Sequence, residues 1–404
     1  MTYDFTKIID RTGKDATAFD GLGTGVWGIA PEKAKNGFSE IPMWVADMNF
    51  ETCPSVTRAL SERIRHPLYG YFLPSDAYFD SIIKWQNTLH GYEGLKAEHI
   101  GYENGVHGCI VTAINVLTEP GDGILLHSPT YNGFLSDLRY TGRKGVFSPL
   151  FKDENGIWRM DFDDMDKKLK ENHIHLAIFC TPHNPTGRVW ERWEIERAME
   201  IYRENNCLVI SDEIWSDIIL GEKKHIPTLM INEDAKERTI SVYAPSKTFN
   251  LAGLIGSYHI IFNPVLRERI VKHGEMTHYN EMNVLSMHAL IGAYESEGYT
   301  WLGELCKTLE KNCRYATDFI NENFNGCKVT MPEATYMLFM DCSEFLKKKG
   351  MSLDELLTAG WDVGVKYQDG RRFAWKDAIR LNVALPESLL HEAMDRLKTH
   401  VFTD

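Results

Sequence analysis

The chain has 404 residues, of which 43% are hydrophobic and 25% are charged, a composition typical of a globular protein long enough for two domains. Its 57 acidic and 44 basic residues give a formal net charge of -13, which argues against nucleic acid or an anionic membrane as a partner. The eight cysteines include no Cys-x-x-Cys pair and the N-terminus has no signal-peptide pattern, which together predict a cytoplasmic protein with reduced thiols. The chain also has no apolar stretch of about 18 residues, so we expect no membrane span.

The N-terminal part of the chain is expected to begin as an irregular arm that ends near residue 40. The apolar run at 42–48 is compatible with a short buried strand. A helix opened by Pro54 is expected over 54–66, and the loop after it contains Tyr71, which by itself could be an ordinary half-buried aromatic. An amphipathic helix is expected over 76–90.

A glycine-bearing turn at 102–108 leads into a helical stretch at 109–117. A turn of this kind presents free backbone N–H groups backed by the positive end of the helix dipole, which favours a phosphate group. We assign this role to the backbone amides of Val106 and His107. The side chain of His107 could bond the phosphate or face solvent.

The middle of the chain alternates short apolar runs with charged helical segments, which predicts an α/β domain whose mostly parallel sheet is covered by helices. The expected strands are 124–127, 176–181, 207–211 and 240–243, and the expected helices are 161–172 and 193–205. Ligands of such sheets bind at the carboxyl ends of the strands. We therefore expect Asn184, Asp212 and Lys247 to meet at one edge of the sheet.

Lys247 is a candidate covalent anchor for an aldehyde cofactor. An amine that condenses with an aldehyde must lose its proton, and the pKa of lysine falls readily on partial burial. Alone, Lys247 could be a surface lysine in a glycine-rich loop. Its companion Asp212 favours the anchor, because a carboxylate facing a pyridine nitrogen keeps that nitrogen protonated, and pyridoxal phosphate (PLP) needs this pairing.

Beyond about residue 285 the pattern changes to long amphipathic helices over 284–297 and 302–323 and a strand-like run over 335–341. This pattern predicts a smaller α+β domain. The expected division is an arm at 1–40 that belongs to the small domain, a large PLP-binding domain at 41–285, and a small C-terminal domain at 286–404.

Arg380 places a charge inside an apolar, strand-like run. A buried guanidinium needs an anion, and its planar fork suits a carboxylate, so a substrate carboxylate and a structural ion pair are both possible partners. The scattered histidines lack companions at zinc-binding spacing, so we expect no metal.

Five segments together carry a resemblance that covers nearly the whole chain. They are PMWVADM at 42–48, PHNPTG at 182–187, SDEI at 211–214, SKTFNLAG at 246–253 and RLNVA at 380–384. They look like the signatures of fold-type I PLP enzymes. Within that superfamily the chain resembles the MalY/PatB group of cystathionine β-lyase-like carbon–sulfur lyases.

The resemblance implies a role for each matching residue. For the cofactor, it implies a covalent bond to Lys247, a pyridine contact with Asp212, a 3-oxygen contact with Asn184, ring stacking by Tyr131 and phosphate contacts from Ser246. For the substrate carboxylate, it implies contacts from Arg380 and from backbone groups near Val45 and Ala46. Tyr71 matches a tyrosine that reaches the cofactor phosphate of the neighbouring subunit, which implies a homodimer with shared active sites.

Three residues depart from the pattern of the group. His107 lies in a segment where the group usually carries the sequence Gly-Val-Val-Pro. Asn132 stands where lyases often carry a second tyrosine. Trp215 stands where many relatives have a tyrosine or histidine able to contact the cofactor 3-oxygen. The change at Asn132 weakens the expectation of a lyase but not that of the cofactor.

The expected activity is that of a carbon–sulfur β-lyase on a cystathionine-like or cysteine-like amino acid, with thiol, pyruvate and ammonia as products. Lys247, once displaced by the substrate amine, would take the α-proton, and Arg380 would hold the carboxylate. An aminotransferase is the nearest alternative, because the same lysine could return the proton to the cofactor. A PLP-binding sensor without turnover is a further alternative.

Overall fold

The computed structural model describes residues 3–403. The chain divides into two compact units, which we call the terminal unit and the central unit. The terminal unit consists of Met1–Glu51, Asn184–Gly187 and Glu304–Asp404, and the central unit consists of Thr52–His183 and Arg188–Gly303.

This division differs from the boundaries expected near residues 40 and 285. Residues 41–51 group with the C-terminal segment because β1 (Ile41–Pro42) pairs in parallel with β13 (Val365–Lys366). Residues 286–303 group with the central unit, where α10 (Val284–Ala293) packs along α2 (Pro54–Arg65).

The central unit is built on a seven-stranded sheet within the described residues, in the order β2-β10-β9-β8-β7-β3-β4. These strands are β2 (Ile100–Asn104), β3 (Gly123–Ser128), β4 (Lys144–Pro149), β7 (Leu176–Cys180), β8 (Leu208–Asp212), β9 (Thr239–Tyr243) and β10 (Gly256–Ile260). All of them run parallel except β10, which is antiparallel to both of its neighbours. The expected β7 and β8 are adjacent, with Ile178 opposite Ile210. The sequence pattern did not indicate β2, β4 or β10, and residues 102–104, expected in a turn, instead end β2.

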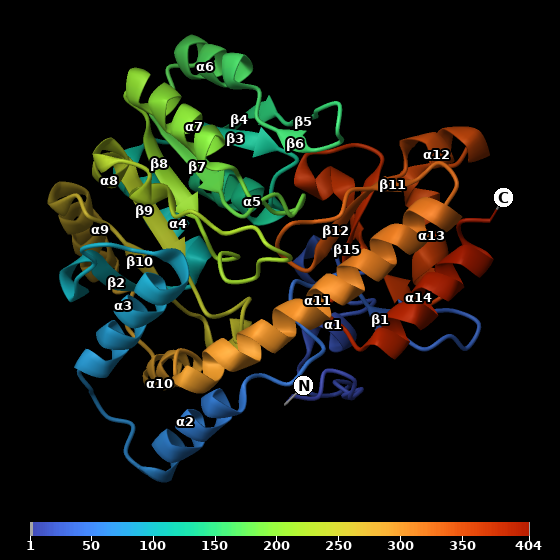
Figure 1. The fold of residues 1–404 in the computed structure, drawn as a ribbon, viewed down its shortest axis with the longest axis horizontal. Coiled ribbons are helices and arrows are strands. Elements are labelled where there is room, and N and C mark those ends of the chain that lie inside the picture. The colour runs from blue at the N-terminus through green and yellow to red at the C-terminus, as the bar shows by residue number, and fades with distance from the viewer. Residues whose placement is uncertain (1–2, 404) are drawn as a thin grey trace. The chain divides into compact units, whose positions relative to one another are not determined.

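Helices lie on both faces of this sheet (Figure 1). Besides α2 and α10, the helices of the central unit are α3 (Asp76–His90), α4 (Val106–Leu117), α5 (Asn132–Thr141), α6 (Phe162–Glu171), α7 (Arg192–Glu204), α8 (Glu233–Arg238) and α9 (Pro264–Thr277). The bounds of α3 match the expectation, and α3 ends at Gly91, whose left-handed φ of 67° favours glycine. A small hairpin of β5 (Phe151–Lys152) and β6 (Trp158–Arg159) completes the unit.

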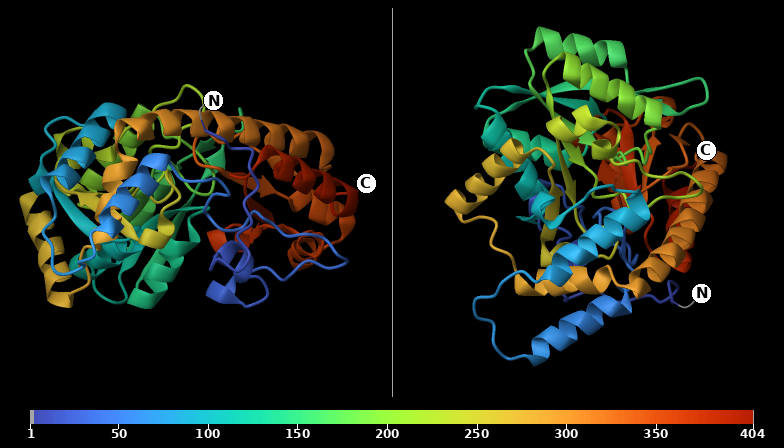
Figure 2. Two further views of the ribbon diagram at one scale, coloured as in Figure 1. Left: turned by 90° about the horizontal axis from the view of Figure 1, so that it is seen from below. Right: turned by 60° about the vertical axis from the view of Figure 1, so that its left-hand side comes forward.

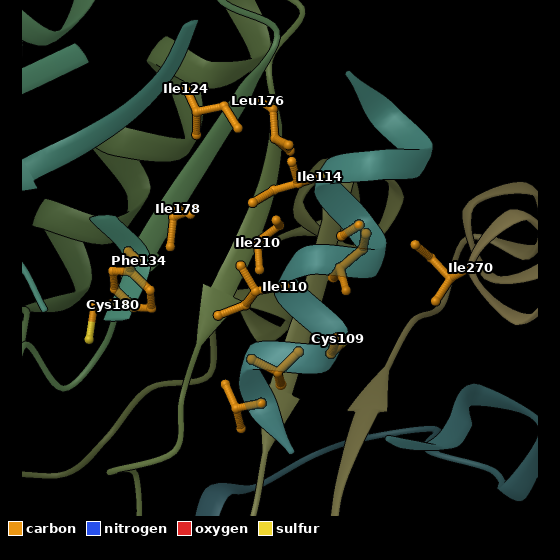
Figure 3. Close-up of a cluster of buried hydrophobic side chains, with 14 of the residues drawn as sticks. Cys109, Ile110, Ile114, Ile124, Phe134, Leu176, Ile178, Cys180, Ile210 and Ile270 are labelled. Carbon is orange, nitrogen blue, oxygen red and sulfur yellow. The ribbon is translucent and has the colours of Figure 1, made fainter. Parts of the chain in front are cut away.

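The core of the central unit lies between α4 and the sheet. Figure 3 shows Ile110 and Ile114 of α4 facing the strand residues Ile178 and Ile210. All four side chains are almost fully buried. Burying apolar surface on this scale is the main driving force for folding, and here it fixes the start of α4 against the carboxyl ends of the strands.

The terminal unit contains a four-stranded antiparallel sheet in the order β11-β12-β15-β14. Its strands are β11 (Lys328–Val329), β12 (Met337–Asp341), β14 (Gln368–Asp369) and β15 (Ala378–Asn382). Its helices are α1 (Thr17–Asp20), α12 (Ser343–Lys349), α13 (Leu353–Asp362) and α14 (Glu387–His400), and the division between the units falls inside α11 (Ser296–Asn323). Figure 2 shows α11 as one continuous helix.

Candidate active site

The carboxyl ends of β2, β3, β8 and β9 meet at one edge of the central sheet, because these four strands share one direction. The residues that follow them include Val106, Tyr131, Asp212 and Lys247. This edge is where open α/β sheets bind their ligands. The structure therefore brings most of the predicted cofactor contacts of the central unit to one edge.

Asp212 ends β8 and is buried, with only 4% of the residue exposed. Its Oδ1 accepts a hydrogen bond from the backbone N of Ile214 at 3.1 Å. Within residues 3–403, no hydrogen bond reaches Oδ2. Burial raises the pKa of Asp212 to about 6, although the Ile214 hydrogen bond and the nearby charges of His107 and Lys247 act to lower it. A buried carboxylate with one oxygen available is suited to a cationic ligand atom.

Glu213, the next residue, holds the end of β8 in place. It accepts hydrogen bonds from Tyr243 Oη and His225 Nε2, both at 2.6 Å, and its own backbone N donates to Val242 O. These contacts tie β8 to β9 and hold the pKa of the buried Glu213 carboxyl down against the opposing effect of burial. Sequence reasoning did not single out this residue, because its partners are distant in the sequence.

Lys247 lies in the loop after β9, with its Nζ 5.7 Å from the centre of the Trp215 ring. A cation above an indole face is attracted by the ring, so Trp215 contributes to the placement of Lys247. The neighbouring Thr248 donates a hydrogen bond from Oγ1 to Asp217 Oδ2 at 2.8 Å. Asp217 also accepts from Trp85 Nε1 at 3.1 Å, which anchors the lysine loop to α3.

The first turn of α4 lies next to this loop in the fold of the central unit. Gly105 precedes the helix with a φ of 79°, a conformation that favours glycine, and α4 begins at Val106, earlier than expected. The first N–H groups of a helix have no partner within it, so the amides of Val106 and His107 can bind an anion.

The His107 side chain is 47% exposed to solvent and also contacts two other side chains, while a bond to the phosphate stays a prediction. Its Nδ1 lies 2.8 Å from Asp137 Oδ2 and its Nε2 lies 3.4 Å from Tyr131 Oη. No pattern along the chain indicated Asp137, because the contact joins two different helices, α4 and α5.

The terminal unit holds the remaining predicted residues. Arg380 of β15 is buried and donates to Asn184 Oδ1 at 3.2 Å, Gln368 Oε1 at 2.6 Å and Trp44 O at 3.3 Å. Its guanidinium also lies 4.5 Å from the centre of the Phe373 ring. Asn184 and Arg380 are thus in contact, whereas the meeting of Asn184 with the central-unit residues Asp212 and Lys247 stays a prediction.

Within the segment 42–48 only Pro42 belongs to a strand, as the last residue of β1, and the chain then bends. Two side chains fix its carbonyl groups: Asn382 Nδ2 donates to Val45 O at 2.6 Å, and Tyr336 Oη donates to Ala46 O at 3.1 Å. These bonds set the orientation of the peptide groups that are expected near the substrate carboxylate.

Two predicted residues have less definite surroundings. Ser246 is half-buried beside Lys247, and Tyr71 lies fully exposed in the segment between α2 and α3. The exposure of Tyr71 rules out an ordinary half-buried aromatic within one chain.

Three potential metal ligands lie within 4.8 Å of one another among the described residues: Glu103, Cys109 and His259. His259 Nδ1 bonds Glu103 Oε1 at 2.7 Å, and Asn280 Nδ2 bonds the other oxygen of Glu103. Both oxygens of Glu103 and Nδ1 of His259 therefore already have protein partners, whereas His259 Nε2 is buried without a hydrogen bond among the described residues, and the expectation of no metal stays a prediction.

The family model described as aminotransferase class I and II matches residues 41–397. The chain belongs to this family. Cystathionine β-lyase PatB of Bacillus subtilis (strain 168) is 31% identical over 398 residues, which cover 98% of this chain and 99% of that protein. The expected resemblance is therefore confirmed.

Solved structures of related proteins show the same fold. The PLP-bound C-S lyase of Staphylococcus hominis has a TM-score of 0.89 at 30% identity and covers 100% of this chain and 99% of its own. A PLP-bound protein of Clostridium difficile 630, provisionally described as an aminotransferase, has a TM-score of 0.90 at 34% identity with full coverage of both chains. The expected fold class, a fold-type I arrangement with a mostly parallel sheet, is confirmed.

None of the helices within residues 3–403 combines the length and the apolar character that a bilayer crossing requires.

Proposed function

We propose that this protein is a PLP-dependent carbon–sulfur β-lyase that releases a thiol, pyruvate and ammonia from a cystathionine-like or cysteine-conjugate amino acid. The observation that carries the proposal is the buried Asp212, whose Oδ2 is available at the sheet edge near Lys247. The lyase names of the PatB and Staphylococcus hominis relatives support the reaction type.

The residues at the sheet edge fit PLP in their chemistry. Asp212 can hold a protonated pyridine nitrogen, the amides at the start of α4 and Ser246 can hold a phosphate, and Tyr131 can lie against a ring. Lys247 can bind the aldehyde. Bound PLP supplies an electron-accepting ring that stabilises negative charge at the substrate α-carbon.

The residues of the chain then have separate tasks. Arg380, with backbone groups near Val45 and Ala46, binds the substrate carboxylate, and Asn184 contacts the cofactor 3-oxygen. Lys247 Nζ takes the α-proton. Thiol release follows when the β-carbon carries sulfur.

We further propose a cytoplasmic homodimer with shared active sites. Tyr71 and its neighbours Leu68, Tyr69 and Leu73 are all exposed in the segment between α2 and α3. Clustered exposed apolar side chains mark interaction surfaces. A second copy of the chain would cover this segment, and its Tyr71 would reach the cofactor phosphate of the first.

An aminotransferase is the second candidate, favoured by the similarity to the Clostridium difficile protein and by Asn132, which replaces the second tyrosine of many lyases. Lys247 would then return the proton to the cofactor instead of allowing sulfur to leave.

The test is to incubate the purified, PLP-loaded protein with a panel of cysteine derivatives, with and without a keto acid. Release of thiol and pyruvate without the keto acid supports the lyase. Turnover that depends on the keto acid supports the aminotransferase, and a yellow protein without turnover supports a sensor.

The covalent anchor is tested by borohydride reduction followed by peptide mass spectrometry. We expect PLP to be fixed to the wild type and to a Lys272→Ala control, which changes an exposed lysine of α9, but not to Lys247→Ala. PLP fixed at another lysine in the wild type would place the anchor elsewhere.

A further inference from the structure

Three side chains at the carboxyl edge of the central sheet form a continuous chain of contacts. Asp137 Oδ2 lies 2.8 Å from His107 Nδ1, and His107 Nε2 lies 3.4 Å from Tyr131 Oη. All three residues belong to the central unit: His107 lies on α4, Asp137 lies on α5, and Tyr131 directly precedes α5. In this arrangement a carboxylate orients an imidazole, whose other nitrogen faces a hydroxyl group.

The backbone of α5 leaves room for this contact. A Cβ atom on Gly133 would lie 2.1 Å from His107 Cε1 and 2.4 Å from Tyr131 Cε1, so no larger residue fits there without displacing both rings. The two rings lie 5.5 Å apart between centroids. The close packing of His107 and Tyr131 therefore depends on a glycine at this position.

The three residues also differ in their access to solvent. The Asp137 side chain is only 10% exposed, whereas the His107 side chain is 47% exposed. Because Tyr131 is half-buried, His107 links a partly shielded phenol to water. A group in this position can exchange protons with solvent while it contacts the site.

The charges around His107 favour its protonated form. Burial and the positive charge of Lys247 act to lower the pKa of His107. The hydrogen bond and charge of Asp137 and the charge of Asp212 act to raise it. The second group of effects is larger, so the pKa of His107 is raised. Burial likewise raises the pKa of Asp137. The carboxylates of Asp137 and Asp212 therefore favour the protonated imidazole, which has a proton to pass on.

We propose that Asp137 and His107 form a proton relay to the Tyr131 hydroxyl, which protonates the thiolate that leaves the substrate. This proposal rests on the proposed lyase function. Asp137 keeps Nδ1 of His107 protonated, as an aspartate does for the histidine of a Ser-His-Asp triad. Tyr131 Oη gives its proton to the sulfur, His107 Nε2 replaces that proton on the phenol oxygen, and solvent reprotonates Nε2. The net change is one proton transferred from water to the thiolate.

A purely structural contact between α4 and α5 is the competing explanation. Such a contact would affect folding stability, but it would not make the rate depend on how basic the leaving sulfur is. A relay that supplies a proton is needed most when the leaving thiolate is basic, as an alkyl thiolate is, and least when it is an acidic aryl thiolate.

The first experiment compares two cysteine conjugates, one with an alkyl thiol and one with a nitroaryl thiol as leaving group. We expect Asp137→Asn and His107→Gln to lower kcat about 10²-fold for the alkyl conjugate and much less for the aryl conjugate, with little change in KM. His391→Gln serves as the matched control. The His391 side chain is 43% exposed, its Nε2 lies 3.6 Å from Glu387 Oε1, and it is far along the chain from His107 and Asp137. Equal losses with both conjugates would overturn the relay.

The second experiment does not depend on turnover. Histidine side chains of the full-length protein, with and without PLP, are labelled with ¹⁵N and titrated by NMR, and His107→Gln identifies the resonance of His107. We expect Asp137→Asn to lower the His107 midpoint by about one pH unit, whereas His391→Gln leaves it unchanged. An unchanged midpoint in Asp137→Asn would show that the two side chains are not coupled and would overturn the proposal.

The two experiments separate failure of the relay from failure of the lyase assignment. A wild-type protein that releases no thiol from either conjugate would overturn the lyase function and, with it, thiolate protonation as the purpose of the relay. The coupling of Asp137 to His107 would still be decided by the titration.

Discussion

Replacing Asp212 by asparagine should stabilise the protein without cofactor and at the same time weaken its hold on PLP. In the folded chain, burial raises the pKa of Asp212 from 3.8 to about 6. One pKa unit corresponds to about 1.36 kcal/mol, so carrying a charged Asp212 costs the folded protein about 3 kcal/mol above pH 6. Asparagine removes this charge and can still accept the hydrogen bond from Ile214 N.

The sign of the pH dependence follows from proton binding. Between pH 3.8 and about 6 the folded state binds more protons at Asp212 than the unfolded state does, so stability from this group is present at low pH and falls as pH rises. The advantage of Asp212→Asn should therefore approach about 3 kcal/mol at pH 8 and shrink to less than about 1 kcal/mol near pH 4.

The assay is urea denaturation of full-length protein without PLP at pH 8 and at acid pH. The control is Asp318→Asn, which changes an exposed aspartate of α11. In parallel, retention of PLP after dialysis should fall in Asp212→Asn alone, because an amide does not stabilise a protonated pyridine nitrogen. An Asp212→Asn protein that is no more stable than the wild type at pH 8 would refute the reasoning.

Two further predictions concern other buried groups. Arg380→Ala should raise KM for amino-acid substrates about 10-fold or more while PLP binding survives, because the buried guanidinium is expected to bind the substrate carboxylate. Steady-state kinetics would show this, with Arg371→Ala, which changes an exposed arginine, as the control. Unchanged kinetics in Arg380→Ala would remove Arg380 from the site. Burial lowers the pKa of His127 from 6.5 to about 4. Between these two pH values the unfolded state therefore binds more protons at His127 than the folded state does. The free energy of unfolding should fall by up to about 3 kcal/mol as pH drops from 6.5 to 4. His127→Leu should flatten this loss in urea titrations, and an equally steep loss in the variant would contradict the assignment.

The parts of the fold that the sequence predicted are those with a strong local pattern. The strands β7 and β8 appear as continuous apolar runs because both faces of each strand are covered, and α3 has an apolar stripe and a glycine at its end. By contrast, β10 contains Gly256, Ser257 and His259, so its pattern does not stand out. Its place in the sheet comes from pairing with strands far away in the sequence.

The candidate site was predictable to a similar degree. Asp212 and Lys247 follow apolar strands directly, so the rule that strand ends meet at one edge places them together. The partners of His107 were not predictable, because no periodicity relates a residue of α4 to Asp137 on α5. The grouping of Asn184 with Arg380 also depends on tertiary contacts that only the structure reveals.

The composition of the terminal unit has a consequence for biosynthesis. This unit draws on three separate stretches of the chain, including the tetrapeptide Asn184–Gly187, and Gly187 O accepts hydrogen bonds from the backbone of both Glu333 and Ala334. No continuous recombinant fragment can reproduce it. On the ribosome, the first 51 residues have to wait for the last hundred or so before their native partners exist, whereas most of the central unit can fold earlier, since domains generally fold as their residues emerge.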